Sequence, residues 1–198
     1  MVKIMDEKIV LASASPRRLE ICRKYGLDPL VIRPDIEEKS QEGEGAYETV
    51  MSLAFQKADS VARGLDGGEI VIASDTIVYF QGEKLGKPRD RAQAFETLRR
   101  LSGRSHRVIT GLAILRAGSN IKLIDYVETR VHFKDLSDET IENYIGSGEP
   151  MDKAGSYGIQ GWGQLLVEAI EGSYLNVVGL PIERLADLLE EYFEIRLL

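Results

Sequence analysis

The segment Ser13-Ala-Ser-Pro-Arg-Arg18 combines two arginines with the expected start of a helix. Serine before proline is typical of a helix that begins at Pro16, whose first-turn amides would carry a partial positive charge and attract anions. In that turn, Arg17 and Arg18 would each cost an isolated helix up to about 1 kcal/mol, and a bound phosphate would reverse the sign of that cost. We therefore predict that at least one of these arginines binds phosphate. The alternative is that both pair with surface carboxylates.

Asp75 interrupts an apolar, strand-like run from Glu69 to Phe80, with Ser74 and Thr76 beside it. Aspartate is disfavoured in strands, and a buried carboxylate without a partner is costly. A metal ion or a cationic neighbour in a substrate site would offset this cost. The alternative is a β-bulge or turn in which the carboxylate bonds local amides.

Two enzyme classes are excluded by missing motifs. A haloacid-dehalogenase phosphatase needs a second aspartate two positions after its nucleophile, where this chain has Ile77. The chain contains no Gly-x-x-x-x-Gly-Lys-Ser/Thr sequence, so the P-loop is absent as well. His106 and His132 are far apart in strand-like segments, which argues against a histidine metal site.

Three further charged residues are weaker candidates. Glu38 follows Pro34-Asp-Ile36 and could bring a carboxylate to a cleft, although such residues are usually solvated. Lys57 stands in an otherwise apolar helical segment, where a lysine that snorkels to the surface is the commoner arrangement. Lys87 is held extended by the proline that follows it, and lysines in turns usually have no specific role.

Glycine recurs at positions 155, 158, 161 and 163 in the segment that begins at Asp152. Glycine lets a backbone approach a ligand closely. Lys153 and Gln160 supply polar groups in the same segment. We predict a ligand-binding loop here, with a flexible surface loop as the alternative.

Hydrophobic periodicity predicts the elements that must position these residues. The expected strands are 9–12, 69–80 with an interruption at 74–76, 107–116, 122–133 and 164–170. The expected helices are 16–25, 44–62, 90–101, a short one after Ser137 and a last one after Pro181. Leu19, Cys22 and Tyr25 are expected to face the core. Hairpin turns at 81–83 and 117–120 break the alternation of strands and helices, so the expected fold class is α/β with a mixed sheet flanked by helices.

Composition limits the class of ligand. The chain has 198 residues without repeats or a linker, so we expect a single domain over 1–198, or two lobes around a cleft. A net charge of −7 argues against long nucleic acid as a partner and favours a small anion. No apolar run is long enough to span a membrane, and the acidic N-terminus does not suit a signal peptide. The single cysteine, Cys22, fits a reducing cytoplasm.

Six segments together resemble the Maf family along nearly the whole chain. They are Leu11-Ala-Ser-Ala-Ser-Pro-Arg-Arg-Leu19, Ala73-Ser-Asp-Thr-Ile-Val78, Gly86-Lys-Pro-Arg-Asp90, Leu101-Ser-Gly103, Asp152-Lys-Ala-Gly-Ser-Tyr-Gly-Ile-Gln-Gly161 and Val178-Gly-Leu-Pro181. Each segment alone is weak evidence, but their shared order and spacing make the joint signal specific.

The resemblance implies a mixed α/β fold with a central cleft, similar to inosine-triphosphate pyrophosphatases and often seen as a homodimer. It implies hydrolysis between the α and β phosphates of a nucleoside triphosphate with a divalent metal, and a link to arrest of septum formation in bacteria. Asp75 matches the family's proton acceptor. Arg17, Thr76 and Gln160 match positions that set substrate preference, and the branch with this threonine and a Tyr-Gly-Ile-Gln run prefers dTTP and UTP.

Glu38, Lys57 and Lys87 match other polar site positions of the family. The resulting hypothesis has Mg²⁺ or Mn²⁺ bridging Glu38, Asp75 and phosphate oxygens, while Asp75 accepts a proton from the attacking water. Cationic side chains neutralise the phosphates, and Gln160 with Thr76 bonds the base edge. The residues expected to bind substrate are Ser13, Ser15, Arg17, Thr76, Lys153 and Gln160.

Two other functions remain open. The protein could be a nucleotide-binding regulator of septum formation and cell division without turnover. It could also be a phosphatase that releases orthophosphate from other esters. Identifying the phosphate species that leaves the substrate separates the last from a pyrophosphatase.

Overall fold

The computed structural model describes residues 7–37, 39 and 43–197. Its strands are β1 (Ile9–Ala12), β2 (Leu30–Ile32), β3 (Ile70–Phe80), β4 (Glu83–Leu85), β5 (Ser105–Arg116), β6 (Lys122–Phe133) and β7 (Val167–Glu171). Its α-helices are α1 (Pro16–Lys24), α2 (Ala46–Ala62), α3 (Arg91–Leu101), α4 (Asp138–Gly146), α5 (Tyr174–Val178) and α6 (Ile182–Phe193). Three 3₁₀ helices, η1 (Glu149–Asp152), η2 (Ala154–Ser156) and η3 (Gly161–Leu166), lie between α4 and β7.

The seven strands form one sheet in the order β2-β1-β3-β5-β6-β7, and β4 pairs with β3 off this path. β1 runs parallel to both β2 and β3, with Val10 opposite Val71 and Leu11 opposite Ile72 on the β3 side. β4 is antiparallel to β3, and β7 is antiparallel to β6 with an irregularity between His132 and Phe133. The expected mixed sheet flanked by helices is therefore confirmed.

The chain divides into two compact units. The first unit comprises Met1–Asp75, Thr110–Val127 and Gly179–Leu198, and the second comprises Thr76–Ile109 and Glu128–Val178. Strands β3, β5 and β6 each contribute residues to both units. The expectation of one domain with a cleft stays a prediction.

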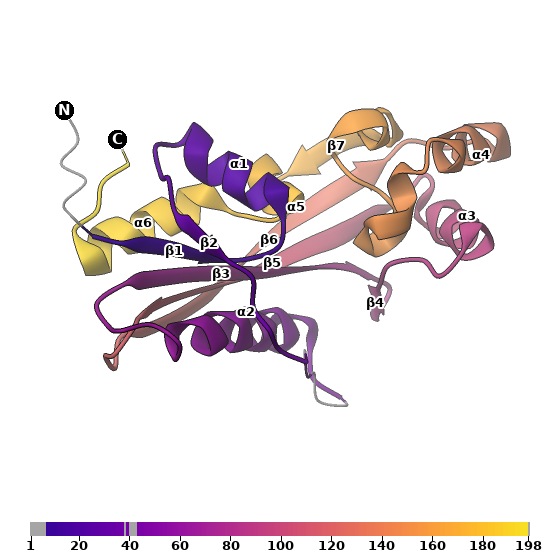
Figure 1. The fold of residues 1–198 in the computed structure, drawn as a ribbon. Helices are drawn as coiled ribbons and strands as arrows, with labels where there is room; N and C mark the ends of the chain where they lie inside the picture. Colours follow the sequence, from indigo (N-terminus) through magenta and orange to yellow (C-terminus); the bar gives the residue numbers. More distant parts are fainter. Residues whose placement is uncertain (1–6, 38, 40–42, 198) are drawn as a thin grey trace. The chain divides into compact units, whose positions relative to one another are not determined.

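In the first unit, helices cover both faces of the sheet. Figure 1 shows α2 on one face and α1 with α6 on the other. Small side chains of α2, including Ala54 and Ala58, pack with Val71 and Ala73 of β3 in one buried cluster. Because side chains alternate along a strand, every second residue of β3 faces α2. That alternation fixes the direction of the polar residues at the end of this run.

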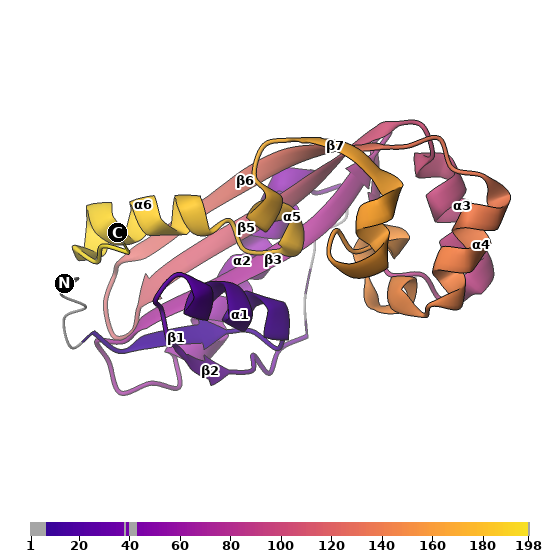
Figure 2. The ribbon, with the colours of Figure 1, turned by 90° about the horizontal axis from the view of Figure 1, so that it is seen from above.

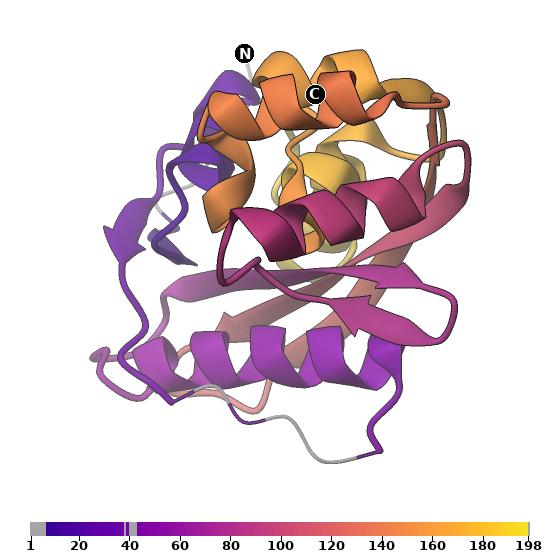
Figure 3. The same cartoon turned by 90° about the vertical axis from the view of Figure 1, so that its right-hand side faces the viewer.

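The second unit has its own core. Figures 2 and 3 show α3 lying beside α4, against which it packs. Residues of β3, β5, β6, α3 and α4 form a buried cluster around Phe133, which is 2% exposed. His106 and Tyr157 meet this phenylalanine edge to face, with ring centroids 5.0 and 4.7 Å away. An aromatic core therefore supports the loop that follows α4.

Most expected elements are confirmed within a few residues, including the hairpin turn at Gln81-Gly82 and the helix cap by Asp90. Three expectations are wrong. β3 is unbroken through 74–76, because the carboxylate of Asp75 has a partner across the fold and needs no bulge. Tyr25 is 36% exposed, because α1 ends at Lys24 and helical spacing no longer applies.

The third wrong expectation concerns a strand that would begin at Gln164. β7 begins at Val167, because residues 164–166 still belong to the 3₁₀ helix η3. β2 and α5 were not expected, since each is at most five residues long and carries no clear period.

Candidate functional site

Asp75 and Lys57 form a buried ion pair in the first unit. The Lys57 Nζ donates to the Asp75 Oδ1 at 2.5 Å, and the two side chains are 12% and 13% exposed. Lys57 does not snorkel to the surface, because its ammonium is directed at the Asp75 carboxylate. The expected cationic neighbour of Asp75 is therefore present, and it comes from a residue 18 positions earlier in the chain.

Strand alternation and a close helix approach make this pair possible. Asp75 follows Val71 and Ala73 at alternate positions of β3, so it points to the face that α2 covers. α2 comes close to the sheet because β5 carries Gly111 beneath it. A Cβ on Gly111 would lie 2.1 Å from the Val50 carbonyl oxygen, so any side chain there would push the helix away. Sequence reasoning missed Gly111, whose only signal is a glycine inside an apolar strand.

The start of α1 carries basic side chains and no acidic residue in its first turn. Ser15 is the N-cap, and its side chain makes no capping hydrogen bond. The Ser15 amide instead donates to the Ser13 Oγ at 3.1 Å. Arg17 forms no hydrogen bond or ion pair with any residue that the structure describes, so a phosphate ligand is chemically suited to this helix start.

Arg18 has a structural task that the sequence did not reveal. Its Nε donates to the Gly179 carbonyl oxygen at 2.9 Å, and the Ser74 Oγ donates to the same oxygen at 3.0 Å. This shared acceptor joins the first turn of α1 to the residue before Asp75. The parallel register of β1 and β3 agrees, because the chain leaves β1 at the level of Ser74. The arginine-led helix start and Asp75 therefore lie at the same level of the sheet, where β1 ends while β3 continues to Phe80.

The remaining predicted residues, Thr76, Lys87, Lys153 and Gln160, belong to the second unit. Lys87 is exposed, and the carbonyl oxygen of Gly86 beside it accepts from the Gly155 amide at 3.1 Å. This bond brings the segments of Lys87 and Lys153 together. Gln160 is exposed on the loop that follows, and Thr76 is partly buried in β3.

Lys153 is engaged within its own loop. Its Nζ donates to the Glu149 carbonyl oxygen at 2.8 Å and to the Asp152 Oδ1 at 2.7 Å. These contacts show that Lys153 helps to hold its own loop. Substrate binding by its ammonium stays a prediction. Sequence reasoning missed Glu149 and Tyr144, whose hydrogen bonds hold the same loop.

The two histidines have structural surroundings. His106 is 2% exposed, and its Nε2 lies 2.7 Å from the Tyr157 hydroxyl. Burial, assisted by the charge of His132, lowers the pKa of His106 to about 3. His132 lies 2.9 Å from the Glu171 carboxylate at the surface. A neutral, enclosed imidazole at position 106 does not suit acid–base catalysis at neutral pH.

A divalent metal can be tested against the donor set. Glu38, the expected second ligand, lies outside the described residues. Within the described ranges, no group of three His, Cys, Asp or Glu side chains could hold a metal ion. Mg²⁺ is commonly held by one or two carboxylates together with substrate phosphates, whereas a structural zinc site needs four protein ligands. Asp75, with one oxygen on Lys57 and a second oxygen remaining, fits the first class.

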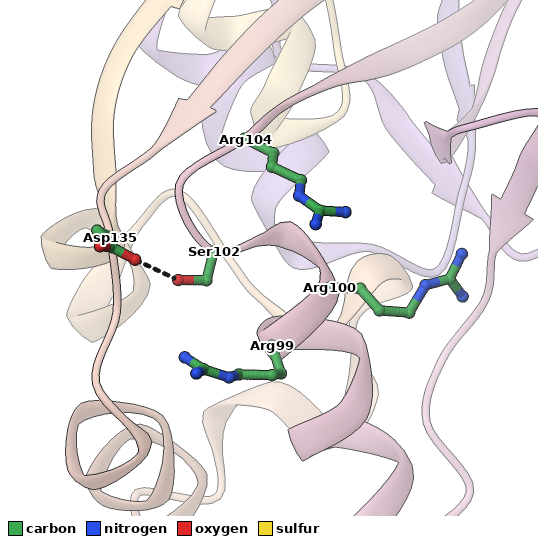
Figure 4. A pocket seen from close by; sticks show the side chains of 5 residues that line it. All are labelled: Arg99, Arg100, Ser102, Arg104 and Asp135. Atoms are coloured by element: carbon green, nitrogen blue, oxygen red, sulfur yellow. Dashed lines mark hydrogen bonds between the residues drawn. The ribbon is translucent and has the colours of Figure 1, made fainter.

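A pocket of about 420 Å³ in the second unit is lined by Arg99, Arg100, Ser102, Arg104 and Asp135 (Figure 4). Its arginines are largely engaged with the protein. Arg99 donates to the Leu136 carbonyl oxygen at 2.9 Å, and Arg100 donates to the Glu83 carboxylate at 2.6 Å. Both stand in the last turn of α3, where positive charge stabilises a helix.

Ser102 in this pocket accepts from the Leu136 amide at 2.7 Å, and Figure 4 shows its hydroxyl directed at Asp135. These contacts explain the Leu101-Ser-Gly103 segment as the end of α3. None of the predicted site residues lines this pocket, so we do not assign the chemistry to it. No helix in the described part of the chain is long and apolar enough to cross a bilayer.

Known proteins resemble this chain in sequence and in fold. A protein named dTTP/UTP pyrophosphatase from Clostridioides difficile is 50% identical, covering 96% of this chain and 97% of its own length. A protein with the same name from a Thermoanaerobacter species is 52% identical, and the match covers 96% of this chain and 100% of that protein. The solved structure of a HAM1 protein from Coxiella burnetii shares the fold, with a TM-score of 0.55 at 20% identity over 93% of this chain and 99% of that one. Residues 8–192 match the model of the Maf-like proteins, and the chain belongs to this family.

Proposed function

We propose that this protein is a nucleoside triphosphate pyrophosphatase that hydrolyses dTTP and UTP to the monophosphate and pyrophosphate. Family membership and the names of relatives about half identical over nearly the full chain support the reaction and the substrates. The structural observation that carries the proposal is the buried Lys57–Asp75 pair, which lies at the level of the sheet where β1 ends and the chain turns into α1. This pair supplies an oriented carboxylate next to a basic helix start.

Asp75 is the proton acceptor in this proposal. Lys57 holds one carboxylate oxygen and thereby orients the other toward a water molecule. As the water oxygen bonds the α-phosphorus, its proton passes to Asp75. The bond from the α-phosphorus to the oxygen that bridges to the β-phosphorus breaks, and pyrophosphate leaves with the electron pair.

Charge on the triphosphate is neutralised by cations and by helix amides. Arg17 and the amides near Ser13 and Ser15 would bind phosphate oxygens, because the start of α1 offers donors and no competing carboxylate. Lys87 and Lys153 would add further positive charge. Asp75 and Glu38 would hold Mg²⁺ or Mn²⁺, and such an ion would neutralise further phosphate charge.

Gln160 and Thr76 would bond the base edge. The amide of Gln160 offers a donor and an acceptor, which match the O4 and N3–H of uracil or thymine. Its exposed position on a glycine-containing loop leaves that amide accessible. We further propose a cytoplasmic homodimer with no nucleic-acid partner, supported by the family resemblance, the single cysteine and the net charge of −7.

A panel of nucleoside triphosphates with Mg²⁺ or Mn²⁺ tests the proposal. We expect pyrophosphate release, fastest with UTP and dTTP, and no orthophosphate unless a separate pyrophosphatase is added. Orthophosphate as the direct product would support a phosphatase instead. Tight nucleotide binding by calorimetry without product would support a regulator without turnover.

A further inference from the structure

Glu149 holds the loop around Gln160 by three hydrogen bonds to its carboxylate. Its Oε1 accepts from the Tyr144 hydroxyl at 3.0 Å and from the Gly163 amide at 3.1 Å. Its Oε2 accepts from the Trp162 amide at 2.9 Å. Bonds to an ionised acceptor are among the stronger hydrogen bonds in proteins. A half-buried carboxylate used in this way is committed to the protein rather than to a substrate.

Tyr144 of α4 connects the Glu149 carboxylate to Gly158, on the other side of Gln160. Its hydroxyl donates to Glu149 and accepts from the Gly158 amide at 3.1 Å. Burial raises the pKa of Tyr144, so its hydroxyl stays protonated and can do both at once. The amides at 158, 162 and 163, which stand on both sides of Gln160, therefore all depend on Glu149 and Tyr144.

The backbone around the Glu149 carboxylate is packed so closely that side chains at Gly161 and Gly163 would clash. A Cβ on Gly161, which has a φ of +68°, would lie 2.6 Å from the Glu149 Oε2. A Cβ on Gly163 would lie 2.1 Å from the Gly158 carbonyl oxygen. The recurring glycines that looked like a ligand-binding loop are thus explained in part by an internal ligand, the carboxylate of Glu149.

Gln160 itself contributes nothing to this arrangement. Its side chain is exposed and makes no hydrogen bond with the described residues. Its backbone, with φ of −91° and ψ of 160°, leads directly into the turn whose amides Glu149 holds. The direction in which the amide of Gln160 leaves the loop is therefore set by the backbone.

We propose that Glu149 is a positioning residue for substrate recognition, which fixes the loop so that Gln160 presents its amide to the nucleobase. This inference rests on the proposed role of Gln160. Glu149 touches no substrate atom in this proposal and acts through Gln160. Loss of its carboxylate loosens nucleotide binding and leaves the chemistry at Asp75 unchanged.

The variant Glu149→Gln keeps the shape and removes one acceptor. In either orientation of the new amide, its NH₂ faces Trp162 or Gly163, whose own N–H then lacks an acceptor. We expect KM for UTP to rise roughly 10-fold while kcat stays within about twofold, since binding energy alone is lost. Tyr144→Phe, which frees only Gly158 and one bond of Glu149, should raise KM by less.

Glu142→Gln is the matched control, because Glu142 is exposed on α4, the helix that packs against η1 and carries Tyr144, and the substitution removes the same charge. It should leave KM for UTP unchanged. The decisive comparison is a double-mutant cycle with Gln160→Ala. If Glu149 acts through Gln160, adding Glu149→Gln to Gln160→Ala raises KM no further. Full additivity, or a Gln160→Ala enzyme with the wild-type KM, would overturn the proposal.

Trp162 supplies a readout that does not depend on activity. It is the only tryptophan of the chain, so its fluorescence reports this loop alone. Trp162 is 66% exposed, so the anisotropy of its fluorescence, which reports motion rather than access, is the suitable readout. Glu149→Gln should lower this anisotropy at an unchanged unfolding midpoint, and Glu142→Gln should not. Unchanged anisotropy in Glu149→Gln would overturn the positioning role even if the enzyme proved inactive on every nucleotide. If the wild-type enzyme were inactive and Glu149→Gln still lowered the anisotropy, the proposed function and the link to recognition would be overturned instead.

Discussion

The two units hold their predicted site residues in different ways. In the first unit, Lys57 stands on α2 and Asp75 on β3, and Gly111 of the neighbouring strand β5 lets α2 approach the sheet closely. In the second unit, Gln160 stands on a loop whose shape depends on hydrogen bonds to the Glu149 carboxylate. One arrangement is fixed by packing and the other by polar bonds.

This difference suits the two tasks that we propose. A proton acceptor must stay within a fraction of an ångström of its productive position, and side chains on packed elements are placed more accurately than those on loops. Base recognition can change when a loop changes, without disturbing the core. The comparison predicts that substitutions at the Lys57–Asp75 pair lower turnover, whereas substitutions around Gln160 alter substrate binding and preference.

Asp75→Asn should have the largest effect. We expect kcat for pyrophosphate release from UTP to fall by a factor on the order of 10² or more, because the proton acceptor is lost. The far-UV circular dichroism should stay native. Asp66→Asn, which neutralises an exposed carboxylate of the same unit, serves as the control and should keep full activity. An Asp75→Asn enzyme with wild-type turnover would remove Asp75 from the mechanism.

Lys57→Met should lower the free energy of unfolding by about 3–5 kcal/mol, because it leaves the buried Asp75 carboxylate without its cation. Urea unfolding measures this. In the double variant Lys57→Met/Asp75→Asn both charges are gone, so stability should partly recover while activity stays lost. Lys87→Met in the second unit removes an exposed ammonium and should change stability by less than about 0.5 kcal/mol. Equal effects of the two lysine variants would contradict the contrast between a buried and an exposed cation.

Gly111→Ala tests whether packing positions Lys57. The added methyl would lie 2.1 Å from a backbone oxygen of α2, so the helix must move, at a cost of about 3 kcal/mol. Turnover should fall while KM for UTP changes little, since the shift displaces Lys57 from Asp75. Gly146→Ala is the control, because a Cβ there meets no atom within 4 Å. A fully active Gly111→Ala enzyme would show that the close approach of α2 does not matter for the site.

Local signals in the sequence were sufficient for much of the fold and for part of the site. The turn at Gln81-Gly82 and the Asp90 cap, which accepts from the Gln93 amide, depend on residues within three positions of each other. Asp75 was found because a carboxylate in an apolar strand needs an explanation. Its partner was only a weak candidate, since the pairing of Lys57 with Asp75 depends on how α2 packs on β3.

Other features could not be predicted because their causes are distant in the chain. Arg18 and Ser74 share the Gly179 carbonyl oxygen, which lies more than 100 residues away from each. The glycines of the second unit were correctly noticed, but part of their cause, the Glu149 carboxylate, lies outside the motif. A period of two or 3.6 residues carries no information on such contacts.

The smallest expected effect is the dependence of the free energy of unfolding on pH, which the histidines of the second unit should produce. Both histidines belong to the second unit, and burial lowers the pKa of His106 to about 3 from an ordinary value near 6.5. The unfolded chain therefore binds a proton that the folded chain does not, and the stability from neutral His106 is complete above pH 6.5 and declines as pH falls toward 3. Between pH 7 and pH 5 the loss should be at most about 2 kcal/mol.

Urea unfolding followed by Trp162 fluorescence measures this loss, because the tryptophan lies in the same unit as His106. His106→Gln should weaken the pH dependence, since no imidazole then titrates on unfolding. In His132→Gln the buried imidazole of His106 remains, so most of the pH dependence should stay. If His106→Gln kept the full dependence, other groups would be responsible, and the aromatic core of the second unit would not be its acid-sensitive part.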